Sequence, residues 1–266
     1  MSNSLDVIVH CFAAQLPQYA AMLRVQARSL VKHAPDGSRI KLVVAVAAPE
    51  HDEPTWAALR EIIADRTMLT FAGGTDHVLY LSEQVSLHIA VLPREQLFRR
   101  AIFRHRWLTR YSAADAVWLA DCDYSVGPGS IEAILAQVQN ETRLVFPKHY
   151  WIHSDHAAGD RAWQAVLAGQ DFVELSDFKQ IEAKVALGGM QILGGSTAKR
   201  VGYLGDSKWQ RPADSERPFA CFFDDSVWRR KHFRDAQPIE IPNLYRMRHS
   251  VGSTGSPGPA GSVDAH

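Results

Sequence analysis

The amino-acid sequence predicts an α/β fold in which a mainly parallel sheet is flanked by helices in a single domain. Short apolar runs alternate with helical patterns over the first two-thirds of the chain, which is typical of parallel sheets covered on both faces. The chain has 266 residues, of which 46% are hydrophobic, so it can build one large core. In such sheets, ligands bind beyond the carboxyl ends of the strands.

Each expected element follows from its apolar period. Strands are expected where a short apolar run stands between turn residues, and helices where apolar residues recur every three to four positions. The expected strands are Leu5–Val9, Ile40–Ala47, Val78–Leu81, Ala116–Ala120, Leu144–Phe146 and Gln191–Leu193. The expected helices are Leu16–His33, Thr55–Ala64, Arg94–Tyr111, Ser130–Asn140, Asp160–Leu167, Asp171–Lys184, Ser196–Tyr203 and Ser226–His232.

The charge balance argues against a nucleic-acid or anionic-membrane partner. Lys plus Arg and Asp plus Glu each number 29, so the formal net charge is zero, whereas such partners favour a basic excess. The arginines cluster locally instead, which suits recognition of a small anion such as a diphosphate.

The cysteines and the chain start predict a cytoplasmic protein. Cys11, Cys122 and Cys221 are odd in number and widely spaced, so they form neither a disulfide framework nor a CxxC metal site. Met1–Asp6 contains no basic stretch before an apolar core, and no apolar run is long enough for a transmembrane segment. Peripheral association with the inner face of a membrane, through a lipid acceptor, is left open.

The end of the chain differs in composition from the rest. From residue 250 to residue 266 the sequence is rich in Gly, Ser, Pro and Ala and has no apolar period. Such a segment buries too little surface to offset its ordering entropy, so a disordered tail is predicted. The remaining residues, 1–249, are expected to form one domain.

Asp121-Cys122-Asp123 is the first candidate functional motif. The two carboxylates directly follow an apolar strand, and a Gly127-Pro128-Gly129 turn and a helix come after them. Carboxylates at i and i+2 on a chain leaving a sheet can both reach a hard divalent cation whose other ligands are phosphate oxygens. The alternative is a turn with solvated aspartates, because a short DxD string occurs often by composition alone.

Two arginines and two glycines are further candidates. Arg100 and Arg104 are four residues apart on one expected helix face, so both could bind a diphosphate; a solvated basic face is the alternative. Gly188-Gly189 precedes an apolar strand, which indicates a close approach of backbone to a ligand or a positive φ, unless the pair forms an ordinary tight turn.

Taken together, these motifs resemble those of GT-A-fold glycosyltransferases, most closely the family-two group and its relatives. The resemblance rests on the strand-helix unit Leu5–His33, the strand that ends at Asp121-Cys122-Asp123, and Asp224-Asp225 before a helix. It spans about residues 5–249. Two features depart from the family pattern: His105 stands where an Asn is usual, and Ala47-Ala48-Pro49-Glu50 replaces an acidic pair.

The resemblance implies a metal-dependent transferase that moves a sugar from a nucleotide-sugar donor to an acceptor hydroxyl, with inversion by single displacement. It implies Mn²⁺ or Mg²⁺ as the cofactor. The acceptor would be a glycan, a lipid-linked molecule or a small molecule. Within the GT-A-like domain, residues 1 to about 146 would bind the nucleotide-sugar, and residues 147–249 would bind the acceptor.

The resemblance also assigns roles to single residues. Asp224-Asp225 resembles the Glu-Asp pair of inverting GT-A enzymes, with Asp224 in place of the Glu and Asp225 matching the general base. The alternative is that either residue only caps the helix, because Asp is a favoured N-cap. Gly188-Gly189 would border the donor sugar. His249 would be a third metal ligand beside Asp121 and Asp123, unless it is a surface or packing residue.

Three other functions can be compared with this hypothesis. A nucleotidyltransferase that makes a nucleotide-sugar would carry a Gly-rich loop after the first strand, where this chain has His10-Cys11-Phe12-Ala13-Ala14. A sugar-nucleotide or glycan-binding protein without catalysis would keep the binding residues alone. A Ser/His/Asp hydrolase is not supported, because no GxSxG pattern is present.

Overall fold

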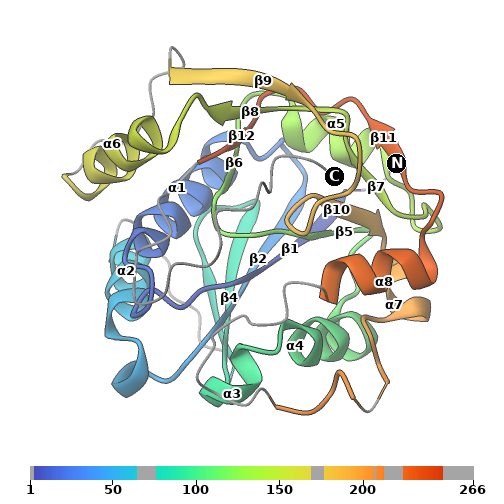
Figure 1. Cartoon of the computed structure of the whole chain (residues 1–266), viewed down its shortest axis with the longest axis horizontal. Coiled ribbons are helices and arrows are strands. Elements are labelled where there is room, and N and C mark those ends of the chain that lie inside the picture. Colours follow the sequence, from blue (N-terminus) through green and yellow to red (C-terminus); the bar gives the residue numbers. More distant parts are fainter. Residues whose placement is uncertain (1–2, 65–75, 169–176, 207, 213–223, 248–266) are drawn as a thin grey trace, which may run out of the picture.

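The computed structural model describes residues 3–64, 76–168, 177–206, 208–212 and 224–247. His249, Cys221 and the predicted tail, residues 250–266, lie outside the described residues. Within these ranges the strands form two sheets, one large and one small, and helices surround the large sheet (Figure 1). This is the predicted α/β class.

The large sheet has the strand order β11-β7-β10-β5-β1-β2-β4-β3 in the described part of the chain. Strands β5, β1, β2 and β4 run parallel to one another, while β10 and β3 are antiparallel to their neighbours. The sheet is therefore mixed, with a parallel centre. Its strands are β1 (Ser4–His10), β2 (Arg39–Val46), β3 (Asp76–Tyr80), β4 (Val85–Val91), β5 (Ala116–Leu119), β7 (Val145–Pro147), β10 (Gln191–Gly194) and β11 (Gln237–Ile239).

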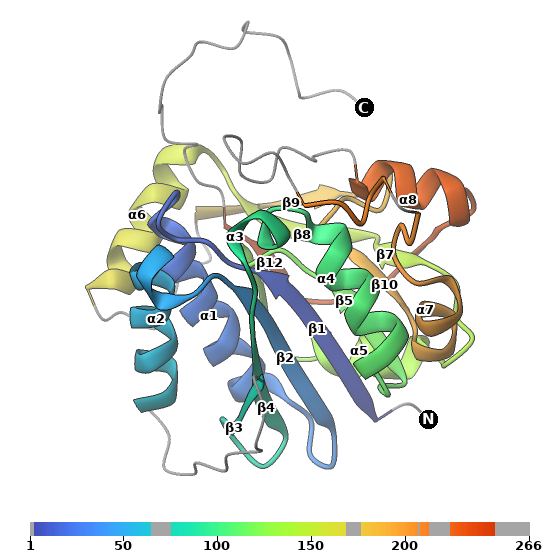
Figure 2. The ribbon, with the colours of Figure 1, turned by 90° about the horizontal axis from the view of Figure 1, so that it is seen from below.

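Helices cover both faces of the parallel strands. Helices α1 (Gln18–His33) and α2 (Glu53–Ala64) lie on one side of β1, β2 and β4, and α4 (Arg100–Arg106) lies on the other (Figure 2). The remaining helices are η1 (Pro49–His51), α3 (Arg94–Leu97), η2 (Trp107–Tyr111), α5 (Ser130–Gln137), α6 (His156–Leu167), α7 (Gly195–Val201) and α8 (Asp224–His232). Among the described residues, none of these helices is long and apolar enough to cross a membrane.

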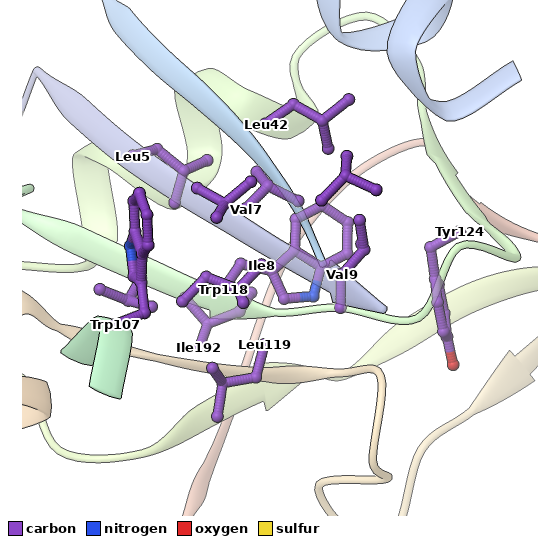
Figure 3. Close-up of a cluster of buried hydrophobic side chains, with 14 of the residues drawn as sticks. Leu5, Val7, Ile8, Val9, Leu42, Trp107, Trp118, Leu119, Tyr124 and Ile192 are labelled. Carbon is purple, nitrogen blue, oxygen red and sulfur yellow. The ribbon is translucent and has the colours of Figure 1, made fainter. Parts of the chain in front are cut away.

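The core lies between the parallel strands and their covering helices. Strands β1, β2 and β5 are almost fully buried, as expected for strands covered on both faces. Figure 3 shows part of this core around β1 and β5: Val7 pairs in register with Trp118 and Ile8 with Leu119, so the two pairs pack on opposite faces of the sheet. The core extends past the ends of β1 and β5 through Cys11, Phe12 and Ala120, and polar Asp121 follows at the edge of the sheet.

The small sheet corrects one prediction. It consists of β6 (Tyr124–Val126), β12 (Leu244–Arg246), β8 (His149–His153) and β9 (Phe178–Glu182). A helix over Asp171–Lys184 was predicted, but β9 pairs antiparallel with β8, and the ring of Phe178 stacks on His153 at 4.1 Å. Pairing with a neighbouring strand here overrides the local helical pattern; residues 171–176 lie outside the described part.

Two further elements differ from the sequence prediction. Strand β4 was not predicted, although it is a central strand between β2 and β3. The predicted continuous helix Arg94–Tyr111 is divided into α3, α4 and a π-helical turn, η2. The break falls at Phe98–Arg99, where the buried ring of Phe98 packs edge-on against Phe12 at 4.9 Å. This packing turns the chain before α4 begins.

Candidate active site

The candidate site lies at the carboxyl edge of the parallel strands. Strand β5 ends at Leu119, two residues before Asp121, and β1 ends beside it at His10. Antiparallel β10 begins at the same edge, since Gln191 pairs with Leu119. The Gly188-Gly189 turn, which precedes β10, is therefore brought next to Asp121. This is the edge at which ligands of parallel sheets bind.

Arg100 connects two of the predicted acidic residues. Its guanidinium donates to Asp121 Oδ1 at 3.0 Å and to Asp225 Oδ2 at 3.2 Å. Asp121 follows β5 and Asp225 lies in the first turn of α8, so one side chain joins two distant parts of the chain. The Arg100 side chain is 13% exposed and that of Asp121 36% exposed. A ligand could therefore reach this end of the cluster.

Arg104 lies behind Arg100 and is fully buried. Its Nη1 donates to Asp225 Oδ1 at 2.7 Å and to the Tyr203 hydroxyl at 3.3 Å, while Nη2 lies 3.8 Å from Asp121 Oδ1. The Tyr203 hydroxyl also donates to Asp225. The solvated basic face considered for these arginines is thus wrong. Arg104 contacts carboxylates inside the protein rather than the surface.

The Asp225 carboxylate is held in its charged form. Burial alone would raise its pKa, but the charges of Arg100 and Arg104 and the hydrogen bond from Tyr203 bring the pKa below its ordinary value. Its hydrogen bonds go to these three side chains, so its described contacts are not those of a helix N-cap. The carboxylate therefore links Arg100, Arg104 and Tyr203.

Asp224 has a different environment from its neighbour. It is fully buried, and neither carboxylate oxygen has a hydrogen-bond partner among the described residues. Burial raises the pKa of Asp224 to about 6, although the charge of Arg100 opposes the rise. Two adjacent carboxylates thus have pKa values moved in opposite directions, an arrangement that often marks an acid-base site.

The two glycines leave no room for side chains at this edge. A Cβ built on Gly188 would lie 2.5 Å from Asp225 Oδ2, and one built on Gly189 would lie 2.9 Å from Asp121 Oδ2. The carbonyl of Gly189 also accepts a hydrogen bond from the indole of Trp118 at 2.9 Å. The pair is therefore a close approach of backbone to both acidic residues and not a turn that any residue could form; the approach to a ligand stays a prediction.

The residues of the DxD motif have unequal surroundings. Asp123 is buried and its Oδ2 accepts from Arg246 Nε at 2.9 Å, whereas Asp121 lies partly exposed beside Arg100. The solvated turn considered for this motif is therefore wrong. No group of three or more His, Cys, Asp or Glu side chains suited to a metal occurs within the described ranges.

These residues nevertheless fit a divalent cation bound from one side. The Asp121 carboxylate offers a hard, partly exposed oxygen of the kind that Mn²⁺ and Mg²⁺ prefer. The backbone N–H of Met247 donates to the Asp123 carbonyl at 2.8 Å, so the described chain runs beside Asp123 two residues before His249. Ligand oxygens would supply the remaining coordination positions.

Tyr203 and Arg246 are functional candidates that sequence reasoning missed. Tyr203 lies between Gly202 at φ +61° and Leu204 at φ +44°, and its ring packs on Trp228 at 4.8 Å. A buried tyrosine usually carries a hydrogen-bonded hydroxyl, yet nothing in the local sequence indicates that its partner is Asp225. For Arg246, the sequence indication is its place in Arg246-Met247-Arg248, directly before the candidate ligand His249.

Comparisons with known proteins add one structural likeness. No protein-family model and no curated protein sequence matches the chain. Among solved structures it is similar to the galactosyltransferase LgtC, whose crystal structure holds donor and acceptor sugar analogs. The identity is 15% and the TM-score 0.40, over 77% of this chain and 63% of that chain, which is less than two thirds of its length. A likeness at this level carries no argument about activity, and it does not support the family-two group in particular.

Proposed function

We propose that the protein is a glycosyltransferase that moves a sugar from a nucleotide-diphosphate donor to an acceptor hydroxyl. The observation that carries the proposal is the convergence of Arg100, Asp121 and Asp225 with the Gly188-Gly189 turn at the carboxyl edge of the sheet. A basic group can bind a diphosphate, and acidic groups can bind sugar hydroxyls; the glycine turn lets the ligand come close to the backbone.

Asp121 and Asp123, with His249 from outside the described residues, are the proposed metal ligands. Mn²⁺ or Mg²⁺ would offset the negative charge of the leaving diphosphate. Arg100 is the arginine proposed to contact the diphosphate, because its side chain is 13% exposed whereas that of Arg104 is fully buried. Arg104 would act one layer further in, by holding Asp225 and the carbonyl of Ala120 in place.

Asp224 and Asp225 are the proposed catalytic carboxylates. A single displacement with inversion needs a base on the face opposite the leaving diphosphate, and a base works best with a pKa near the operating pH. While Asp225 is bound to Arg100 and Arg104, its lowered pKa makes it a weak base. If the donor diphosphate binds Arg100 and so replaces the Arg100–Asp225 contact, the pKa of Asp225 rises and Asp225 becomes a stronger base. Asp224, with a pKa of about 6, is the alternative proton acceptor.

The proposal extends to the partners and the location of the protein. The acceptor would be a glycan, a lipid-linked molecule or a small molecule, bound by residues 147–249, and the donor side would lie within about residues 1–146. We propose a cytoplasmic enzyme. A lipid-linked acceptor would bring it to the inner face of a membrane.

The test is a panel of nucleotide diphosphates and nucleotide-sugars, measured by thermal shift with and without Mn²⁺. A donor at one hundred times its Kd stabilises the native state by about 2.7 kcal/mol. We expect one base to raise Tm strongly, and to do so only with the metal. A chain that binds nucleoside triphosphates and sugar phosphates better than any nucleotide-sugar would instead be a nucleotidyltransferase, and binding without transfer would indicate an inactive binding protein.

A further inference from the structure

A cavity lies on the α4 side of the large sheet, away from the acidic cluster. It has a volume of about 210 Å³ and lies between β2, β3, β4 and the π-helical turn η2. Lys41, on its floor, pairs in register with Asp6 of β1, four residues before β1 ends at His10. At about 3.3 Å per residue this puts the cavity roughly 13 Å from the carboxyl edge.

The walls of the cavity are aromatic. Trp107 and Tyr111 of η2 line one side, with ring centroids 5.7 Å apart, and His88 of β4 meets Trp107 edge-on at 5.9 Å. The indole N–H of Trp107 is already bound to Asp6 Oδ2 at 2.8 Å, so the ring contributes its apolar surface. Val78 and Ala90 complete an apolar slot. Such a slot favours a flat ring over a bulky aliphatic group.

One charge faces this slot. His88 is uncharged at neutral pH, because burial and the nearby Lys41 lower its pKa to about 4, and its Nε2 lies 3.2 Å from Ser86 Oγ. Lys41 is then the charged side chain among those lining the cavity, all of which belong to the described residues. Asp6 pairs in register with Lys41 on the neighbouring strand and is fully buried, with Oδ2 bound to Trp107. Burial raises the pKa of Asp6, while the hydrogen bond from Trp107 and the charge of Lys41 oppose the rise. Lys41 is only half-buried, so its ammonium can also contact an anion that enters from outside.

The surface around the cavity is also unusual. Among the described residues, the exposed large apolar side chains are Tyr80, Val91 and Tyr111, at 47%, 36% and 50% exposure. All three belong to elements that line the cavity, and Tyr111 lines it directly. The cavity is bordered by a π-helical turn, a rare form that is frequently found at functional sites. The proposed transferase activity uses none of these residues.

We propose that this cavity binds a small planar aromatic carboxylate, with the ring between His88, Trp107 and Tyr111 and the carboxylate on Lys41. The site does not depend on the proposed function, because it shares no residue with the acidic cluster. Helix α4, which carries Arg100 and Arg104, continues directly into η2, so a ligand here would contact the turn that follows that helix.

Three small probes test the chemistry on the full chain by ligand-observed NMR and calorimetry. Benzoate is flat and anionic, cyclohexanecarboxylate is anionic but not flat, and benzyl alcohol is flat but uncharged. We expect benzoate to bind about tenfold more tightly than benzyl alcohol, because losing a charge-assisted hydrogen bond costs about that factor. Benzoate should also bind up to about tenfold more tightly than cyclohexanecarboxylate, which keeps the charge but loses the aromatic ring contacts. Equal binding of all three, or no benzoate binding up to its solubility, overturns the proposal.

Variants test the position of the site. Lys41→Met and Tyr111→Ala should each weaken benzoate binding about tenfold, whereas Lys199→Met, an exposed lysine on α7, should leave it unchanged. Ala90→Leu should fill the cavity and abolish benzoate binding. If the Ala90→Leu variant fails to fold, Tyr111→Ala still tests the position of the site. Unchanged benzoate binding in both Lys41→Met and Tyr111→Ala would place the ligand elsewhere and contradict the inference.

Discussion

Arg104 and Asp225 form a buried ion pair, with Nη1 of the arginine 2.7 Å from Oδ1 of the carboxylate. Neither residue is exposed by more than a tenth, and they are 121 positions apart in the sequence. The pair ties α8 to α4 at the carboxyl edge of the sheet. Taking charges into the interior is costly, so such a pair persists only when both partners have further hydrogen bonds. Here Tyr203, Arg100 and the carbonyl of Ala120 provide them.

Breaking this pair should destabilise the protein strongly. Arg104→Met leaves Asp225 buried with less compensating charge, and removal of one partner of a buried pair costs about 3–5 kcal/mol. Urea unfolding measures this cost. Arg110→Met is the control, since Arg110 is exposed on η2 of the same helical segment. If both variants unfold at the same urea concentration, the buried pair contributes little to the fold.

Gly188→Ala should damage the site without a matching effect elsewhere. The new Cβ would meet Asp225 Oδ2 at 2.5 Å, so Asp225 must move away from Arg100 and Arg104. We expect donor binding, measured by thermal shift, to fall at least tenfold. Gly37→Ala is the control, because Gly37 has φ +73° and nothing within 4 Å of its Cβ position. That variant should lose about 1 kcal/mol from backbone strain and keep donor binding; equal donor affinity in both would refute the close approach.

Asp224→Asn should stabilise the protein at neutral pH. The pKa of Asp224 is raised from 3.8 to about 6 in the folded state, so the folded protein binds the proton more tightly than the unfolded chain. The wild type therefore loses stability as the pH rises from about 4 to about 6, by up to about 3 kcal/mol. Asparagine has no such titration, and the Tm advantage of the variant should grow between pH 4.5 and pH 7.5.

The control for this experiment is Asp36→Asn, at an exposed position. Its Tm difference from the wild type should stay nearly constant over the same pH range. A Tm advantage of Asp224→Asn that is flat with pH would mean that Asp224 is not a buried carboxylate with a raised pKa. If Asp224 is the catalytic base, the transfer rate should rise with pH through about pH 6, because the carboxylate loses its proton there. If Asp225 is the base, the rate should stay flat around pH 6, because its pKa is lower than usual.

Asp121→Asn and Asp123→Asn should separate metal binding from folding. Asp121 is partly exposed, so its variant should keep a near-normal Tm while losing Mn²⁺-dependent donor stabilisation. Asp123→Asn also removes the buried partner of Arg246 and should unfold more easily as well. Isothermal titration with Mn²⁺ and the nucleotide checks both variants. Metal-dependent binding that survives in both would remove these residues from the proposed site.

The sequence predicted the central fold because buried parallel strands leave a strong local signal. The strands β1, β2 and β5 contain the apolar runs Val7–Val9, Leu42–Val46 and Ala116–Leu119, and polar His10 and Asp121 near the ends of β1 and β5 mark the ligand edge. Strand β9 could not be predicted in this way, since its pattern is half-polar and it forms by pairing with β8. Strand β4 has a strong apolar pattern in Val85–Val91, and that signal was overlooked.

The residues of the candidate site could be selected from the sequence, but the contacts between them could not. Arg100, Asp121, Asp225 and Gly188 were each indicated by their position beside a strand or on a helix face. That Arg100 contacts both Asp121 and Asp225 depends on the tertiary fold, and no spacing in the sequence encodes it. The same holds for Tyr203, whose hydroxyl lies between Arg104 and Asp225.

The central claim, transfer of a sugar from a nucleotide-diphosphate donor, is tested most directly by following the anomeric proton of the donor by NMR. The donor that stabilises the protein in the thermal-shift panel is incubated with Mn²⁺ and candidate acceptors, using wild-type protein and the Asp121→Asn variant. We expect the wild type to release the nucleoside diphosphate and form a product of inverted anomeric configuration, with the variant slower by at least a hundredfold. A product of retained configuration would contradict the single displacement, and equal turnover by both proteins would contradict the site itself.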